Sequence, residues 1–506
     1  KYDSLLELPQ MTENVRYDGS LKASVILKDL APFVPALSRF EEPLDLNLVF
    51  SGHGKHLDCP TLQLANHHGL MIAGEAALSN WDAGMDMYIY GKLGNLIMTK
   101  EGINVLMTNL TGKVPPILQR LDYIRFNGEA AGYLHDLTLT GLFYTGAGMV
   151  KTDVMMSIDE QSMSRTYSGS VASADLDLGK LLNQEKKFGK VDFNVELKGF
   201  NYKNRYPESY IKGIISSFEY SQYQYENIML DGVYKDGGFN GRLSMDDANG
   251  SVQIDGNFNV AKTIPDFNLK ASVKNLRPHD LHLSDKYENA SISLGLTADF
   301  TGKSIDDMNG RISLDSLQLN APDERGCFLD NLTITAGQVS GEKELRINSS
   351  FMTAVIRGDY SYHTIPASVV KTVQRYIPSL LTIKDNMPEP HNNFQFDICL
   401  ENAEVLSKLF QIPLELYLPA SLKGYFNDGE EKLHVEGHFP EFRYNGTRYD
   451  SGVLFCENPS DRFKCSLRGG MLMKSGAMLN FSVEANAKND HLETTINWGN
   501  NTDVTY

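Results

Sequence analysis

Five residues of the types that bind transition metals lie close together in the first part of the chain. His53, His56 and Cys59 follow one another at three-residue spacing, and His67 and His68 come shortly after. A tetrahedral zinc site needs four such ligands to converge on one point. Alternation along a strand would instead send His53 and His56 to opposite faces. We therefore expect polar residues around a glycine turn here, and no metal site.

Two pairs of adjacent carboxylates, Asp246 with Asp247 and Asp306 with Asp307, raise the question of glycosidase chemistry. Glycosidases place two carboxyl groups across the scissile bond. Both pairs here fall at turn signals, where Asp side chains bond the local backbone. The sequence also has no G-x-S-x-G nucleophile motif, no P-loop, and no G-x-G-x-x-G leading from a strand into a helix. We expect neither an enzyme nor a bound cofactor.

The five cysteines are too few and too scattered to form a disulfide framework. Cys456 and Cys465 flank the turn sequence ENPSDR. A turn centred on Pro459 and Ser460 pairs Cys456 with Phe463, whereas a loop two residues longer places the two cysteines opposite each other. Two alternatives are open for this pair: apolar strand residues, or one disulfide.

Composition limits the partners of this 506-residue chain. The formal net charge of −17 argues against nucleic-acid binding, which relies on Lys and Arg to neutralise phosphate. The apolar runs are far shorter than the roughly 18 residues of a transmembrane helix, and residues 1–20 lack the zones of a signal peptide. Since the chain opens in strand-like sequence, we expect a piece of a longer protein whose targeting segment lies outside it.

Apolar and polar residues alternate along most of the chain, as in half-buried strands. Turn signals such as Asp-Gly and Asn-Gly separate these segments, roughly every ten residues. Helical periodicity is confined to residues 30–40, 100–106, 114–121, 368–381 and 403–410. We predict an all-β fold, an elongated and curved antiparallel sheet with short interspersed helices. Residues 191–200 and 290–300 place the following side chains on one apolar face: Val191, Phe193, Val195, Leu197, Ile292, Leu294 and Leu296.

Residues 225–260 read as three strands joined by two tight turns. The dipeptide Asp236-Gly237 is typical of a two-residue hairpin, and such a turn fixes which residues pair. It pairs Leu230 with Leu243, and a second turn at 247–250 continues the same face onto a third strand. The face is then lined by Ile228, Leu230, Tyr234, Phe239, Leu243, Met245, Val252, Ile254 and Phe258.

A row of glycines crosses these three predicted strands. Gly232, Gly241 and Gly256 fall in register, and such a row indicates a crease where a sheet bends. We therefore expect a curved unit with an apolar inside. The pattern leaves open what covers that inside. A second sheet would complete a sandwich, whereas an uncovered sheet would form a trough.

Internal echoes indicate repeats. The sequence NGRLSMD at 240–246 returns as NGRISLD at 309–315, which puts Ile312 and Leu314 at the positions of Leu243 and Met245. Looser echoes pair 34–54 with 115–132 and 170–182 with 269–283. We expect degenerate repeats of roughly 70 to 100 residues. They would form one continuous array over residues 1–130, 131–365 and 366–506, the last stretch led by a helix.

The chain resembles TamB-type translocation and assembly module proteins, which belong to the AsmA-like group of bridge-like lipid transfer proteins. The resemblance extends over nearly the whole chain as a pattern, without one diagnostic motif. It rests on residues 396–458, the segment VPPILQRLDYIRFNGEAAG, the modules at 170–199 and 269–283, and the repeated NGR[LI]S[ML]D.

This resemblance implies a taco-like β-groove whose hydrophobic concave face conducts phospholipid acyl chains through the periplasm, between the inner and outer membranes of a diderm bacterium. It also implies a role in outer-membrane biogenesis with a TamA-type outer-membrane barrel as partner. The family's inner-membrane anchor is absent from this sequence, and barrel contact through regions outside it is expected.

Physical chemistry is consistent with that expectation. A lipid tail of about 16 carbons loses roughly 0.8 kcal/mol for each CH2 exposed to water, on the order of 13 kcal/mol in all. Carrying it through water therefore requires a continuous apolar lining and no catalytic group. Two alternatives stay open. One is a scaffold for the assembly of outer-membrane proteins and autotransporters, and the other is a tandem β-sandwich adhesin or glycan-binding array.

Overall fold

The chain divides into two compact units, residues 1–248 and 249–506. The computed structural model describes residues 15–30, 39–159, 161–162, 164–201, 208–286, 288–322, 326–380 and 392–500. In each unit the described strands form one open antiparallel sheet. The predicted all-β antiparallel class is confirmed. The three stretches expected from the sequence, 1–130, 131–365 and 366–506, stay predictions.

The first unit contains thirteen described strands, three described α-helices and two described 3-10 helices, Leu27–Leu30 and Gly84–Asp86. The strands are β1 (Arg16–Ile26), β2 (Pro43–His53), β3 (His56–Ala65), β4 (Leu70–Ser79), β5 (Tyr88–Thr99), β6 (Tyr123–Tyr133), β7 (Asp136–Thr145), β8 (Gly148–Ile158), β9 (Arg165–Asp177), β10 (Phe188–Asn201), β11 (Glu208–Tyr220), β12 (Tyr223–Lys235) and β13 (Gly238–Asp247). The α-helices are α1 (Lys100–Thr111), α2 (Pro116–Gln119) and α3 (Leu178–Leu182).

The second unit contains the remaining described elements. Its strands are β14 (Gly250–Asn259), β15 (Asp266–Leu276), β16 (Ser291–Thr301), β17 (Asn309–Asn320), β18 (Cys327–Val339), β19 (Glu342–Ser349), β20 (Met352–Asp359), β21 (Asn393–Leu400), β22 (Leu414–Leu416), β23 (Ala420–Asn427), β24 (Lys432–Tyr444), β25 (Thr447–Glu457), β26 (Phe463–Leu472), β27 (Met478–Lys488) and β28 (His491–Asn500). Its helices are α4 (Ile365–Gln374) and α5 (Glu404–Phe410).

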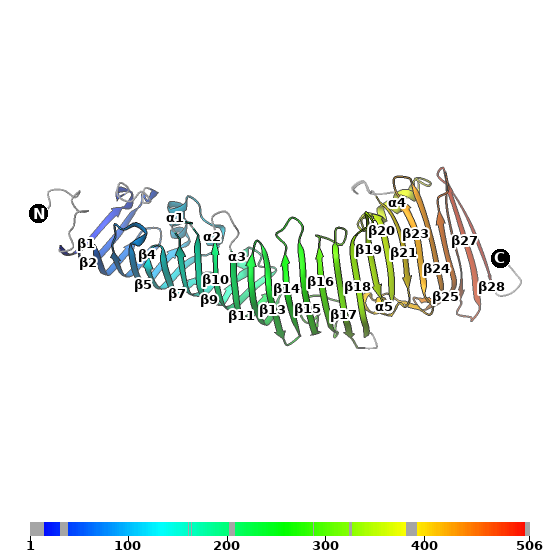
Figure 1. The fold of residues 1–506 in the computed structure, drawn as a ribbon, viewed down its shortest axis with the longest axis horizontal. Coiled ribbons are helices and arrows are strands. Elements are labelled where there is room, and N and C mark those ends of the chain that lie inside the picture. The colour runs from blue at the N-terminus through cyan, green and yellow to red at the C-terminus, as the bar shows by residue number, and fades with distance from the viewer. Residues whose placement is uncertain are drawn as a thin grey trace. The chain divides into compact units, whose positions relative to one another are not determined.

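Each unit is a meander in which strands adjacent in the chain are neighbours in the sheet (Figure 1). The exception among the described strands is in the second unit, where β21 pairs with β23 and the short β22 pairs with β24. Thirteen strands about 4.8 Å apart make a sheet about 60 Å wide, against about 36 Å for the length of an eleven-residue strand. The first unit is therefore elongated across its strands, as the sequence predicts.

The hairpin of β12 and β13 confirms the register predicted from its turn. Asp236 and Gly237 have φ of 50° and 78°, and a type I′ turn requires two such left-handed residues. The pairs are Ile228 with Met245, Leu230 with Leu243, Gly232 with Gly241 and Tyr234 with Phe239. The second predicted register, across residues 247–250, joins the two units and stays a prediction.

The glycine pair in this hairpin lies where two strands approach closely. A Cβ on Gly241 would lie 2.4 Å from the Gly232 Cα, and a Cβ on Gly232 would lie 2.6 Å from the end of the Phe239 ring. Any larger residue would push the strands apart, and Phe239 covers the bare backbone. Gly128 and Gly141 pair in the same way between β6 and β7.

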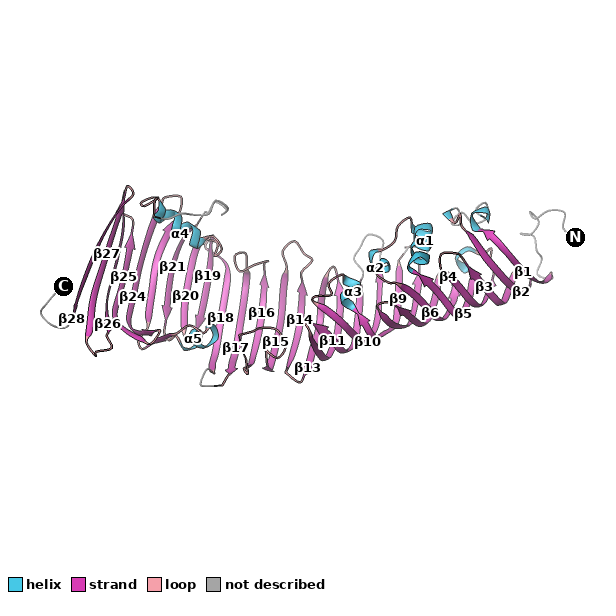
Figure 2. Cartoon of the chain, turned by 180° about the vertical axis from the view of Figure 1, so that it is seen from behind, coloured by secondary structure: helices cyan, strands magenta, loops and turns pink. Residues whose placement is uncertain are grey.

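The helices lie at the margins of the sheets (Figure 2). In the first unit α1, α2 and α3 lie along one margin, and in the second α4 and α5 lie at opposite margins. Thr99 caps α1, because its Oγ1 accepts a hydrogen bond from the Gly102 N–H at 3.2 Å, and Asp177 caps α3 by accepting from the Lys180 N–H at 2.8 Å. None of the described helices has the length and apolar character of a membrane span.

Four of the five predicted helical segments contain or overlap a helix. These are α1, α2, α4 and α5, although α4 begins at Ile365 and not at Ser368. Most of the predicted segment 30–40 lies outside the described residues. Sequence analysis missed α3, because five residues are too few to show helical periodicity.

Buried cores occur where a helix packs on the sheet. In the first unit Ile103 of α1 packs with Leu121, Ile124 and Val191. In the second unit the α4 side chains Ile365 and Val369 pack against a cluster that contains Phe394, Phe426 and Leu433, while Val405 of α5 packs with Leu317 and Leu329. Within the described residues no second sheet covers the first in either unit. The described residues therefore do not form the tandem sandwiches of the second alternative, and its adhesin or glycan-binding function stays a prediction.

Candidate functional site

The first candidate surface is the apolar face of the first unit, defined as the side of β1–β13 that carries Leu230. Leu230 lies opposite Leu243 on β13 and Gly213 on β11, and Gly213 lies opposite Val195 on β10. Followed strand by strand, this row contains Leu243, Leu230, Gly213, Val195, Val171, Thr152, Gly141, Gly128, Leu93, Gly74, Leu62, Leu48 and Leu21. Only one member, Thr152, carries a polar side chain.

The residues predicted in β10, β12 and β13 all lie on this apolar face. Phe193 of β10 pairs with Ile215 of β11, which pairs in turn with Ile228 of β12. In the same way Leu197 pairs with Ile211, and Ile211 pairs with Gly232. The predicted members are Val191, Phe193, Val195, Leu197, Ile228, Leu230, Tyr234, Phe239, Leu243 and Met245.

Protein covers the apolar face at its margin and leaves its middle accessible. Val191 is only 6% exposed, because it packs in the cluster of α1 and the α3 segment. Val195, Leu197, Leu230 and Leu243 are half-buried and belong to none of the buried clusters among the described residues. A contiguous apolar surface left accessible in this way is typical of a binding surface.

The opposite face of the same strands is polar and carries charges of alternating sign. Arg242, Asp231, Lys212 and Glu196 lie side by side on four strands, and Lys212 Nζ is 3.2 Å from Asp231 Oδ2. The Tyr210 hydroxyl donates to Asp231 at 2.8 Å, and it lowers the pKa of that carboxyl together with Lys212. Exposed pairs of this kind add little stability. They keep this face hydrated, so the two faces differ sharply in polarity.

The second unit repeats this two-faced arrangement. On its apolar side Ile254 lies opposite Ala271, and Val252 and Phe258 lie opposite Val273 and Phe267. The remaining predicted residues continue the same side onto β16 and β17: Ile292, Leu294, Leu296, Ile312 and Leu314.

Helix α5 covers part of this side. Ile292, Leu294 and Leu314 pack against the buried cluster that contains Val405, and Leu409 of α5 joins them. Ile312 packs against the cluster under α4, and Leu296 stays half-buried outside both clusters. Contact of these residues with a ligand stays a prediction.

No site residue was predicted on the apolar face of β1–β9 or of β11. The strand pairings place four further apolar side chains on this face: Leu48, Leu62, Phe126 and Leu139. The same apolar alternation marks LDLNLVF at 44–50 and DLTLTGLF at 136–143, so this signal was present in the sequence.

The first two histidines do not lie on one strand, the arrangement that would send them to opposite faces, but on either side of a glycine turn. A tight turn at Gly54 and Lys55 reverses the chain, so that His53 and His56 lie directly opposite each other on one face, with ring centroids 5.4 Å apart. His56 Nδ1 lies 2.7 Å from Ser79 Oγ. Within the described residues no three His, Cys, Asp or Glu side chains converge as a metal site would require.

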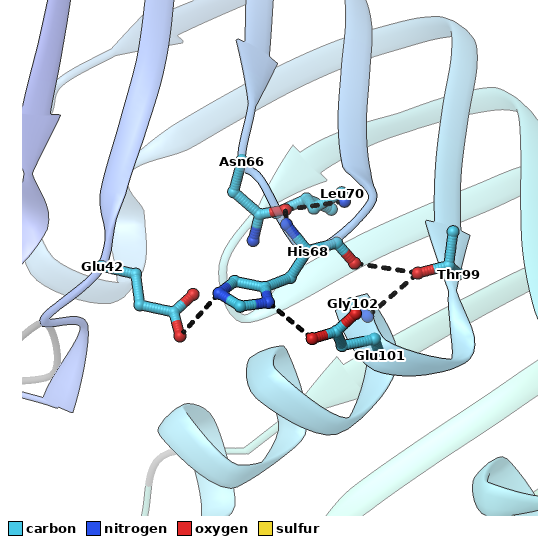
Figure 3. Close-up of polar contacts among 7 residues, drawn as sticks. All are labelled: Glu42, Asn66, His68, Leu70, Thr99, Glu101 and Gly102. Atoms are coloured by element: carbon cyan, nitrogen blue, oxygen red, sulfur yellow. Dashed lines mark hydrogen bonds and ion pairs between the residues drawn. The ribbon is translucent and has the colours of Figure 1, made fainter.

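His68 lies between two carboxylates in the first unit (Figure 3). Its Nδ1 is 2.8 Å from Glu101 Oε1 at the start of α1, and its Nε2 is 3.3 Å from Glu42 Oε1. The hydrogen bond with Glu101 raises the pKa of His68, and the charge of Glu42 adds to the shift. Since only the imidazolium can donate to both carboxylates, this contact ties the loop before β4 to α1 most firmly when His68 is protonated.

Three carboxylates of the two pairs accept hydrogen bonds from the protein itself. Asp247 accepts from Tyr223 Oη at 2.5 Å and from the Glu226 N–H at 3.1 Å, both on the neighbouring strand β12, so the prediction that it bonds its own turn is wrong. Asp307 accepts hydrogen bonds from the backbone N–H groups of Lys303 and Ser304, as predicted for a turn residue. Asp306 instead accepts from Ser361 Oγ and the Tyr362 N–H, and so holds its loop against the segment before α4. A partner so distant in the chain is not visible in the local sequence.

Cys456 and Cys465 lie directly opposite each other on β25 and β26 and are joined by a disulfide. The longer of the two predicted loops is therefore the observed one. Asn458 holds it, since its Oδ1 accepts a hydrogen bond from the Leu433 N–H at 2.7 Å and its Nδ2 donates to Tyr376 Oη at 3.2 Å. The pair lies on the apolar side, in the row that contains Val435.

No protein-family model, curated protein or solved structure matches the chain. A function can therefore be inferred only from the chemistry of the apolar face. That face offers a long apolar surface, few hydrogen-bonding side chains and glycines at its centre. These features suit an unbranched apolar ligand that lies across many strands.

Proposed function

We propose that this chain conducts phospholipid acyl chains along its apolar face, in the periplasm of a diderm bacterium, as part of lipid transport between the inner and outer membranes. The observation that carries the proposal is the row from Leu21 to Leu243. Its members lie opposite one another on consecutive strands. Three of them, Val195, Leu230 and Leu243, are half-buried and lie outside the buried clusters of the described residues.

The chemistry of an acyl chain fits such a row. Methylene groups gain about 0.8 kcal/mol each on leaving water, and this gain needs no directional contact. A ligand of this kind can move along the row, because each step replaces one apolar contact by an equivalent one. The polar opposite face and the net charge of −17 suit an aqueous compartment.

Two further points support the periplasmic setting. A disulfide between Cys456 and Cys465 is typical of an oxidising compartment. The sequence pattern resembles TamB-type proteins of the AsmA-like group, in which a TamA-type barrel is the outer-membrane partner. A role in outer-membrane biogenesis with such a barrel is part of the proposal.

Lipid extraction from the protein, purified in the absence of detergent, tests this function. We expect phospholipid in at least roughly equimolar amount by mass spectrometry, because an accessible apolar face of this length is costly to leave in water. Folded protein that carries no lipid, and takes up none from vesicles, would contradict the proposal. A scaffold for outer-membrane proteins would instead retain client peptides, which the same spectra would identify.

A further inference from the structure

A pocket of about 790 Å³ lies on the apolar side of the second unit, between two loops at one margin of its sheet. One loop is 260–265, between β14 and β15, and the other is 302–308, between β16 and β17. The volume falls within the range of small-molecule sites, roughly 300 to 1,000 Å³. The pocket is therefore large enough for a ligand of its own.

Aromatic and aliphatic side chains form the floor of this pocket. The Phe267 and Phe300 rings stack with centroids 4.7 Å apart, and Ile312 and Ile334 lie opposite each other beside them. Phe300, Ile312 and Ile334 also pack against the buried cluster under α4. The floor is thus fixed by the protein core and does not depend on a ligand for its shape.

The walls of the pocket are apolar side chains in unusually exposed positions. Val260 is 62% exposed and Ile305 is 55% exposed, one on each loop. Two exposed aliphatic side chains that flank an apolar floor indicate a surface that is covered when a ligand is present. The ligand that suits them is an alkyl chain.

Two lysines line the same pocket, and they differ in their partners. Lys262 Nζ is 2.7 Å from Asp266 Oδ1, so its charge is paired. Lys303 is exposed, and its ammonium forms no ion pair or hydrogen bond with any described residue. An unpaired cation beside an apolar pocket can bind the charged end of an amphiphile.

The carboxylates nearest to Lys303 in the chain are already engaged. Asp307 accepts from the Lys303 N–H at 2.9 Å and from the Ser304 N–H at 2.7 Å. The first of these bonds is the main reason that the pKa of Asp307 falls to about 2. Asp306 is bound to Ser361 and Tyr362. The Lys303 side chain is therefore the group on this loop that remains available to an external anion.

We propose that this pocket binds the acyl chain of an anionic phospholipid, with the phosphate of its headgroup at Lys303. The proposal rests on the proposed function and adds a preference of headgroup at one position along the path. Zwitterionic lipids fit the apolar floor equally well, but their ammonium group offsets the attraction of the lysine.

Photo-crosslinking with two lipids tests this proposal. The probes are phosphatidylglycerol and phosphatidylcholine with the same diazirine-bearing acyl chain, and the readout is crosslinked peptide from residues 300–312. We expect the full chain to give about tenfold more crosslinking with phosphatidylglycerol than with phosphatidylcholine, because both lipids offer the same phosphate but the choline ammonium of the second repels Lys303. Lys303→Gln should remove this preference, and Lys303→Arg should keep it.

Lys274→Gln is the matched control. Lys274 is also exposed and lies on β15, at the other end of the strand from the pocket, and its replacement should leave the preference unchanged. Equal labelling by both lipids in the unmodified protein, or an unchanged preference in Lys303→Gln, would overturn the headgroup proposal. Labelling confined to β12 would overturn the pocket but leave the proposed function standing. No labelling anywhere would overturn both.

Discussion

Replacing Leu230 by aspartate is expected to lower the phospholipid bound to the purified protein by more than about tenfold, because an unpaired carboxylate against an alkyl chain costs several kcal/mol. Leu230 is half-buried midway along β12, with Leu243 opposite it, and it belongs to none of the buried clusters of the described residues. The added charge therefore meets the ligand and not the protein core. The measurement is lipid per protein by mass spectrometry after extraction.

Met229→Asp is the matched control for Leu230→Asp. Met229 is the preceding residue on the same strand, it points to the polar face, and it is 55% exposed. The same added charge there should leave bound lipid unchanged, and both variants should unfold at similar temperatures. Equal loss of lipid in the two variants would show that the faces of β12 do not differ in function.

Replacing Phe426 by alanine is expected to have the largest effect on stability, about 3 to 5 kcal/mol in the free energy of unfolding. Phe426 is 2% exposed and packs with Phe394, at 5.9 Å between ring centroids, and with Leu433. The cavity left by the ring would lie in the cluster that holds α4 on the sheet. Urea unfolding followed by hydrogen exchange in β21, β23 and β24 measures the loss.

Tyr425→Ala separates burial from the removal of an aromatic ring. Tyr425 is adjacent to Phe426 on β23 but lies on the opposite face and is 46% exposed. Its replacement should cost less than about 1 kcal/mol. Similar losses in the two variants would mean that the side of this sheet under α4 is not the core.

The register and the two-faced character of the strands were predictable, because they depend on local rules. In β12 and β13 the turn residues Asp236 and Gly237 fix the pairing, and every predicted pair is observed. Once pairing is fixed, alternation decides which side chains share a face. Alternation likewise predicted that Val195 and Leu197 share one face of β10, and the registers through β11 place that face on the side of Leu230.

Contacts between distant segments were not predictable in this way. Ile292 and Leu294 are covered by α5, a helix that follows them by more than a hundred residues in the chain. The loop that sets Cys456 opposite Cys465 depends on two hydrogen bonds of Asn458, which accepts from the Leu433 N–H and donates to Tyr376 Oη. Alternation reveals that a face is apolar, but what lies against it is decided by the packing of the whole unit.

The proposal that the apolar face itself carries the lipid is tested most directly by a photo-crosslinking scan along β12. A photoreactive amino acid is placed in turn at Ile228, Met229, Leu230, Asp231 and Val233, and crosslinked phospholipid is measured at each position. The proposal predicts strong crosslinks at Ile228 and Leu230 and only background at Met229, Asp231 and Val233, which lie on the polar face. Crosslinks of equal strength at all five positions, or none at Ile228 and Leu230, would contradict it.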